Sequence, residues 1–188
     1  SPGALAFVEA VAKRVAAARG AALFVDYGYA AGTAGDMLRG FRRHAQVSPL
    51  KEPGLVDLTV DADFAACGAQ AAAIDGGQGG GGARPDVFGA VPQGEWLMRM
   101  GIVPRLEALL NLDDITEKQV EDLISACERL VDPEQMGARY KVLAVVGDAQ
   151  GEPPAGFVQD DRVPPPDEGP PIAFDTATED GTPAPPPP

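Results

Sequence analysis

Apolar positions in the first 25 residues change from a helical spacing to a continuous run. Five of them recur three or four positions apart: Leu5, Val8, Val11, Ala12 and Val15. This spacing predicts a helix that begins at Ser1-Pro2 and ends at Gly20, where glycine accepts a left-handed conformation. Residues 21–25 (AALFV) are all apolar and predict a strand buried on both faces of a parallel sheet. Helix, tight turn and buried strand form one unit of an α/β fold.

The pattern is less regular between residues 30 and 60, where glycines and prolines recur. We expect a long loop here, and loops of this length in compact domains are usually functional. Asp63 is then the predicted N-cap of an alanine-rich helix that reaches Ala73.

The following residues predict three further helices and a last strand. Gly101 ends the first of these helices, and Pro104 can open the second. Thr116 and Gln119 have the spacing of a capping box, and the apolar stripe after them is a set of core positions. The predicted segments are helices over residues 95–100, 105–110 and 120–131, and a strand over 140–146.

Charge and proline content divide the chain of 188 residues, whose net charge is −13. Twelve of the 19 prolines and eight acidic residues lie beyond residue 150, where Arg162 is the one basic residue. Such a segment cannot offset its chain entropy by burial, so residues 148–188 are predicted to be a disordered acidic tail. A proline-rich ligand of a partner is the alternative. Residues 1–147 form the predicted domain, with a flexible Gly-rich insertion at 75–87 that lacks the strand and helix of a phosphate loop.

Composition excludes several classes of function. The acidic balance argues against nucleic acid as a partner, and no apolar run is long enough to span a bilayer. Cys67 and Cys127 lack metal-ligand spacing and indicate small buried side chains in a reducing compartment. A single histidine, His44, makes a histidine-based metal site a poor interpretation.

Three stretches, in this order, carry a family resemblance. They are residues 21–28 (AALFVDYG), 38–64 (LRGFRRHAQVSPLKEPGLVDLTVDADF) and 92–102 (PQGEWLMRMGI). Together they resemble the MidA-like S-adenosylmethionine (SAM)-dependent methyltransferases, and the resemblance covers residues 1–147. It implies an α/β fold, namely the C-terminal half of a Rossmann-like class I methyltransferase sheet with helical elements.

The chain departs from that family in the features that hold the cofactor. The family's SAM fingerprint is a Gly-rich loop after its first strand and an acidic residue after its second, and neither is found here. We therefore expect a fragment that lacks the cofactor side of the domain and is inactive alone.

The resemblance also implies a function for the intact protein. The mitochondrial branch of the family methylates an arginine on a subunit of respiratory complex I during assembly, and residues 38–41 resemble that branch. The implied cofactor is SAM, the implied partner is that protein substrate, and a homodimer is a further expected partner. The implied location is the mitochondrial matrix, with the cytoplasm as the alternative. A non-catalytic binding module or assembly factor is the alternative function.

An arginine acceptor demands carboxylates, because guanidinium is protonated at physiological pH and is a poor nucleophile. Carboxylates can orient its nitrogens and accept the released proton. Ligands of open α/β sheets bind beyond the carboxyl ends of strands, which is where residues 26–29 lie. The candidate catalytic residues are Asp26, Asp61 and His44. The candidate substrate-binding residues are Tyr27, Gly28, Arg39, Asp57, Thr59 and Asp63.

Five of the candidates have a structural alternative. Asp63 can cap a helix, and Asp61 can accept from loop N–H groups. Asp57 can form hydrogen bonds within the long loop, the ring of Tyr27 can cover the edge of the core, and His44 can be a hydrogen-bond donor with a structural role.

Overall fold

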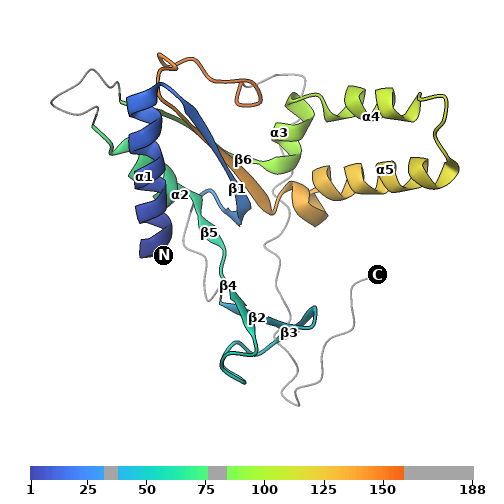
Figure 1. Cartoon of the computed structure of the whole chain (residues 1–188), viewed down its shortest axis with the longest axis horizontal. Helices are drawn as coiled ribbons and strands as arrows, with labels where there is room; N and C mark the ends of the chain where they lie inside the picture. The colour runs from blue at the N-terminus through green and yellow to red at the C-terminus, as the bar shows by residue number, and fades with distance from the viewer. Residues whose placement is uncertain (32–37, 76–83, 159–188) are drawn as a thin grey trace.

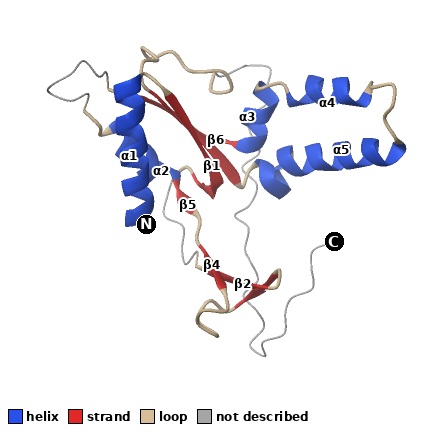
Figure 2. Cartoon of the chain, in the orientation of Figure 1, coloured by secondary structure: helices blue, strands red, loops and turns tan. Residues whose placement is uncertain are grey.

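The computed structural model describes residues 1–31, 38–75 and 84–158. Its main sheet has the strand order β5-β1-β7-β6, and Figure 2 draws the strands in red. Strand β7 runs antiparallel to both β1 and β6, whereas β5 is parallel to β1. The α/β fold class is confirmed. The bounds are Ala21–Tyr29 for β1, Ala62–Asp63 for β5, Asp86–Pro92 for β6 and Tyr140–Val146 for β7.

Helices α1 (Pro2–Ala18) and α2 (Phe64–Ala72) pack together on one face of this sheet (Figure 1). The apolar stripe of α1 supplies half of the core between helices and sheet, which confirms the spacing read from the sequence. The buried residues of this core are Val8, Ala12, Val15, Ala71, Ile74 and Val145.

The prediction that residues 21–25 are buried on both faces is wrong. Ala22 and Phe24 pack against the core, but Leu23 is 54% exposed and Val25 is 51% exposed. Both described helices that cover β1 lie on the Ala22 side, and α3 (Gln93–Arg99) contacts β6 and β7. The other face of β1 is therefore uncovered within the described residues.

The ends of α1 and α2 show how local signals operate. Arg19, and not Gly20, takes the left-handed conformation after α1, with a φ of 50°. Asp63 caps α2 as predicted, since its carboxylate accepts from the N–H of Ala66 at 2.9 Å. This bond satisfies one of the N–H groups that the first turn leaves free.

Residues 38–60 form a second sheet, where the sequence indicated a loop. Strands β2 (Arg39–Arg42), β3 (Ala45–Val47) and β4 (Asp57–Thr59) pair antiparallel in the order β3-β2-β4. These strands are too short for a period of two to be visible. We call residues 38–60 the β-arm, because they project from the main sheet (Figure 1).

The turn inside the β-arm also escaped prediction. Arg43 and His44 connect β2 to β3, and both have positive φ values, 49° and 65°. Two-residue hairpin turns of this kind usually carry Asn or Gly, which are absent at these two positions.

Helices α4 (Ile102–Leu110) and α5 (Glu117–Val131) form an antiparallel pair that extends from α3. We call residues 102–131 the α-hairpin. The predicted capping box of Thr116 and Gln119 is present and begins α5, but the prediction that the apolar stripe after it is a set of core positions is wrong, since no residue of α5 is buried. At the other end of α5, the buried Gln93 donates to the carbonyl of Leu130 at 2.9 Å, which fixes the base of the α-hairpin to α3. A short π-helical turn, Pro133–Gly137, then leads to β7, which the sequence predicted.

Residues 148–158 pack on the domain, although the sequence assigned them to the tail. The carbonyl of Gly156 accepts from Arg99 at 3.4 Å, and the rings of Phe157 and Phe88 lie 6.5 Å apart. The rest of the predicted tail and the Gly-rich run at 76–83 lie outside the described residues. Across the three described ranges, no helix has the length and apolarity to cross a membrane, and no acid, cysteine and histidine cluster could hold a metal.

Candidate functional site

Several of the predicted site residues meet where the carboxyl end of β1 reaches the β-arm. Strand β5 follows the arm and pairs with β1 at Gly28↔Ala62 and Tyr29↔Asp63. A Cβ atom on Gly28 would lie 2.1 Å from the carbonyl oxygen of Ala62. Only glycine allows this approach, so Gly28 determines how closely the two strands come together. Its predicted contact with substrate stays a prediction.

Tyr27 is the centre of the cluster. Its hydroxyl group is hydrogen-bonded to the hydroxyl of Thr59 in β4, and its ring packs edge-to-face against Tyr140 with centroids 5.8 Å apart. The guanidinium carbon of Arg39 lies 5.5 Å from the ring centroid. Burial raises the pKa of the Tyr27 hydroxyl above its usual value, and the charge of Asp26 adds to this, against the opposing charge of Arg39.

Arg39 also forms an ion pair with Asp61, and the two side chains are only 12% and 16% exposed. The pair joins the first strand of the β-arm to the residue that precedes β5. A partly buried pair is costly to break from one side, because the remaining charge loses its partner. One oxygen of the Asp61 carboxylate thus binds Arg39, and an incoming guanidinium would have to share the carboxylate with Arg39.

Four of the nine predicted site residues therefore lie in one connected cluster: Tyr27, Arg39, Thr59 and Asp61. We call it the Tyr27 cluster. It contains two hydroxyl groups, one carboxylate and one guanidinium, which can position a polar substrate but offer little proton-accepting capacity beyond Asp61.

Asp26 and Asp63 differ in what occupies their carboxylates. Asp63 caps α2, the structural alternative that the sequence raised. Asp26 is exposed and accepts only from the N–H of Tyr27, at 2.8 Å, in the hydrogen bonds of the described residues. It keeps lone pairs for another donor, so it is the carboxylate at this edge best able to bind a guanidinium.

Asp57 and His44 lie further along the β-arm. Asp57 is exposed and faces Phe41 in the β2–β4 pair, and His44 is exposed in the β2–β3 turn. None of the contacts in the described ranges joins either residue to Asp26 or Asp61. Their catalytic or binding roles stay predictions.

Two residues of the last strand belong to this edge, although the sequence did not single them out. Tyr140 packs on Tyr27, and Lys141 is the antiparallel partner of Asp26. Burial lowers the pKa of the Lys141 ammonium group, which donates to the carbonyl of Ala138 at 2.5 Å. The only signal in the sequence was their place at the start of the predicted strand, which does not reveal the register with β1.

Comparison with known proteins agrees with the fold and with the family resemblance. Residues 1–78 match the family described as "Putative S-adenosyl-L-methionine-dependent methyltransferase". A curated relative from Danio rerio, the mitochondrial protein arginine methyltransferase NDUFAF7, is 36% identical over 143 residues, which are 76% of this chain and 31% of the relative. The Drosophila melanogaster homologue is 39% identical over 137 residues, 72% of this chain and 28% of that protein.

A solved structure gives the same picture. A COG1565 superfamily protein from Burkholderia thailandensis, bound to S-adenosyl-homocysteine, matches with a TM-score of 0.61 and 26% identity over 82% of this chain and 36% of that one. The chain thus spans about a third of the length of the proteins that it matches.

Proposed function

Because this chain belongs to the MidA-like family of SAM-dependent methyltransferases, we propose that it forms the acceptor side of a protein-arginine methyltransferase. The observation that carries the proposal is the 36% identity, over 143 residues, to a curated protein arginine methyltransferase. The exposed carboxylate at the end of β1 adds chemical support, since arginine is the side chain that a carboxylate binds most specifically.

In the proposed mechanism, SAM would supply an electrophilic methyl group and leave as S-adenosyl-homocysteine, and this chain positions the arginine that receives the methyl group. Asp26 accepts hydrogen bonds from the guanidinium, orients one nitrogen toward the methyl group and takes up the proton that leaves. The Tyr27 cluster fixes the wall of the acceptor site, because Arg39 and Thr59 hold the β-arm against β1. The described residues contain no strand, Gly-rich loop and helix in series, so we propose that this chain alone does not bind SAM and is inactive.

The acceptor and the location are finer proposals. The curated relatives are named as mitochondrial proteins, which supports a mitochondrial location for this one. A subunit of respiratory complex I as acceptor rests on the family resemblance. Association of two copies also stays a prediction.

A non-catalytic binding module is the second candidate. The ion pair of Asp61 with Arg39 favours it, since that guanidinium competes with an incoming arginine for the carboxylate. Titration calorimetry of this chain with SAM tests the fragment hypothesis. We expect no measurable binding, and a micromolar dissociation constant would contradict the proposal that the cofactor side is missing.

A chimera tests the proposed activity directly. Residues 1–146 of this chain would replace the matching segment of the Danio rerio relative. Scintillation counting would measure the transfer of radiolabelled methyl groups from SAM, and mass spectrometry would show that arginine receives them. We expect activity in the chimera and a loss of about 100-fold or more with Asp26→Asn. Glu52→Gln, on the exposed side of the β-arm, is the matched control. An inactive but folded chimera would favour the binding module, and full activity of Asp26→Asn would remove Asp26 from the mechanism.

A further inference from the structure

The α-hairpin is amphipathic but has no buried residue in either of its helices. It extends sideways from α3 and contacts the rest of the domain mainly at its base (Figure 1). The apolar side chains of α4 and α5 remain partly exposed, and Leu112, at the free end, is 57% exposed. A helix pair with an apolar stripe and no layer over it is incomplete as a packing unit.

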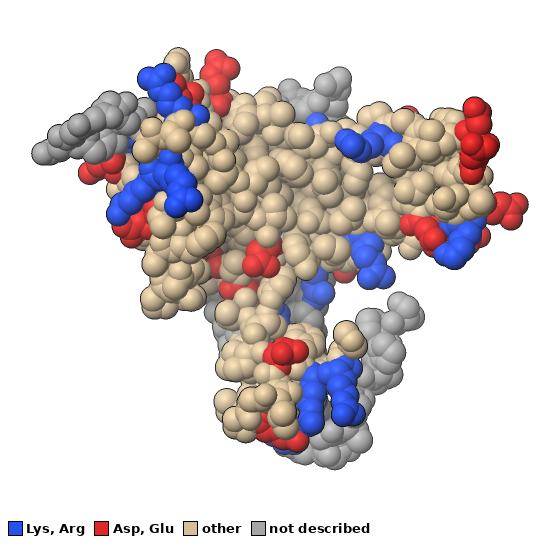
Figure 3. All heavy atoms as spheres, viewed as in Figure 1, with Lys and Arg blue, Asp and Glu red and all other residues tan. Residues whose placement is uncertain are grey.

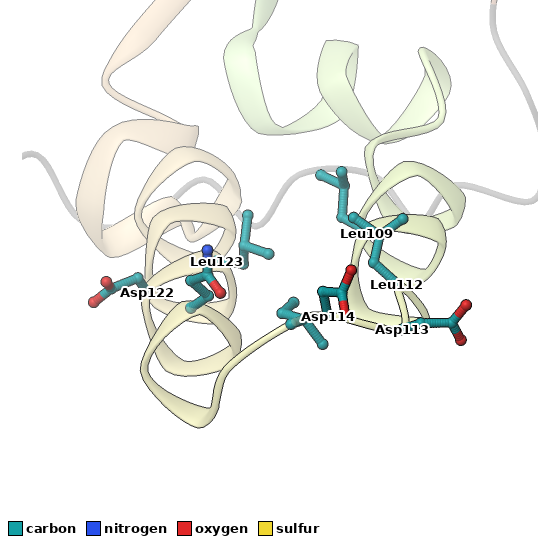
Figure 4. A pocket seen from close by; sticks show the side chains of 8 residues that line it. Leu109, Leu112, Asp113, Asp114, Asp122 and Leu123 are labelled. Carbon is teal, nitrogen blue, oxygen red and sulfur yellow. The ribbon is translucent and has the colours of Figure 1, made fainter.

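A cavity of about 650 Å³ lies between the two helices at this free end. Its apolar lining comes from Leu109, Leu112, Ile115 and Leu123. In Figure 4, Leu109, Leu112 and Leu123 point toward the space between the helices, whereas Asp113 and Asp122 point outward on its two sides. The volume lies within the range of ligand pockets, so the groove can accept several apolar side chains at once.

The rim of the groove is acidic, and two of its carboxylates form no ion pair with another described residue. Asp122 is paired with Lys118 at 2.6 Å, but neither Asp113 nor Asp114 pairs with a base of the described residues. Figure 3 shows acidic side chains gathered over the free end of the α-hairpin. These carboxylates would attract an arginine or lysine placed beside the groove.

Charge also decides between the possible occupants. Residues 102–131 contain seven acidic and three basic residues, so the α-hairpin has a net charge of −4. A second copy of the hairpin would bring the same charge to the same place, and like charges across an interface oppose association. A basic partner is attracted instead.

We propose that the groove between α4 and α5 binds a basic amphipathic helix of a partner protein, with its apolar side chains between the helices and its arginines or lysines against Asp113 and Asp114. The partner helix completes a three-helix layer, the usual way in which a groove between helices recognises a peptide. This docking needs no methyl transfer, so it holds or fails independently of the proposed function.

The probe is a fluorescein-labelled synthetic peptide of about five helical turns, built from Leu, Ala and Lys with the leucines on one face. Its binding to the 188-residue chain is followed by fluorescence anisotropy. A scrambled peptide of the same composition and a peptide with Glu in place of Lys are the controls. We expect a dissociation constant of about 10–100 µM for the probe and at least about tenfold weaker binding of both controls. Equal binding of the scrambled peptide, or no binding of the probe, would overturn the proposal.

Variants of the chain locate the site. Leu112→Gln, and separately the pair Asp113→Asn with Asp114→Asn, should each weaken binding of the probe by about tenfold. The matched controls are Leu50→Gln, an exposed leucine of the β-arm, and the pair Glu134→Gln with Glu152→Gln, which removes the same charge elsewhere. The controls should stay within about twofold.

Circular dichroism checks that each variant keeps its helix content. The aspartate pair carries the test if Leu112→Gln unfolds, because both side chains lie on the surface. Equal losses in test and control variants would contradict the assigned groove. Sedimentation velocity tests whether a second copy of the chain fills the groove instead. A dimer that Leu112→Gln dissociates would show that it does and would overturn the proposal.

Discussion

Arg39 and Asp61 form an ion pair across 22 positions of the chain, with both side chains largely shielded from solvent. The pair closes the base of the β-arm, since Arg39 begins β2 and Asp61 immediately precedes β5. The arm and the end of β1 are thereby held as one unit around Tyr27.

Asp61→Asn should lower the free energy of unfolding by about 1–3 kcal/mol, because it removes the charge of a carboxylate that pairs with Arg39 where both side chains are shielded from water. Urea denaturation measures the loss, and hydrogen exchange of the amides in β2 and β4 should show that the β-arm opens first. Glu52→Gln breaks the more exposed pair with Arg42 and is the matched control. It should cost less than about 1 kcal/mol, and equal effects would contradict the role of burial.

Tyr27→Phe should make the unfolding free energy less sensitive to alkaline pH. The folded-state pKa of Tyr27 is raised, so its contribution is fully present below its unfolded pKa of about 10 and is lost as pH rises further. The variant should also lose about 1 kcal/mol at neutral pH with the Thr59 hydrogen bond. Urea denaturation from pH 7 to 11 measures both effects. Part of the dependence of the unfolding free energy on pH should remain, because the pKa of Tyr29 is raised as well. If Tyr27→Phe leaves that dependence unchanged, the raised pKa of Tyr27 is contradicted.

Gly28→Ala should destabilise the junction of β1 and β5 by about 1–3 kcal/mol, because the new methyl group meets the Ala62 carbonyl. Gly20→Ala is the control, since a Cβ atom there has no neighbour within 4 Å. Thermal unfolding of both variants makes the comparison. A drop in Tm confined to Gly28→Ala supports the close approach, whereas equal drops would indicate a general effect of removing glycine.

Val25→Lys should reduce self-association of this chain. Val25 lies on the uncovered face of β1, and the described partner β5 reaches β1 only at Gly28 and Tyr29, so the adjacent edge is open to another strand. Sedimentation velocity at increasing concentration should show association that the lysine suppresses. Leu50→Lys adds the same charge to an exposed site of the β-arm and should have no such effect.

Local signals made part of this structure predictable. The capping box at Thr116, the cap at Asp63 and the apolar stripe of α1 each lie within a few residues, so the sequence alone indicates them. Strand β7 was predictable because its four central residues are buried and apolar.

Pairing between distant segments was not predictable in this way. The strands of the β-arm are three or four residues long and turn at Arg43 and His44, which carry no usual turn signal. The exposure of Val25 depends on which helices cover β1, and the apolar residues 21–25 do not themselves indicate this.

The candidate site shows the same limit. The sequence named Asp26 and Tyr27 from their place at a strand end. The structure adds Lys141, which lies opposite Asp26 although the two residues are 115 positions apart, and no local pattern encodes that register. It also shows that Asp61, named as catalytic, is held by Arg39.

The β-arm meets the main sheet at its base, where Thr59 and Arg39 contact Tyr27 and where β5, which follows the arm, pairs with β1 at Gly28 and Tyr29. Insertions or deletions between β2 and β4 therefore alter the length and outline of the arm while the order of the main strands stays the same. Under the proposed function, such changes in length would alter the surface that the β-arm presents to a protein substrate, with the carboxylate at Asp26 left in place. If the β-arm tolerates such changes in length, sequence variation among related chains should be concentrated between residues 43 and 56.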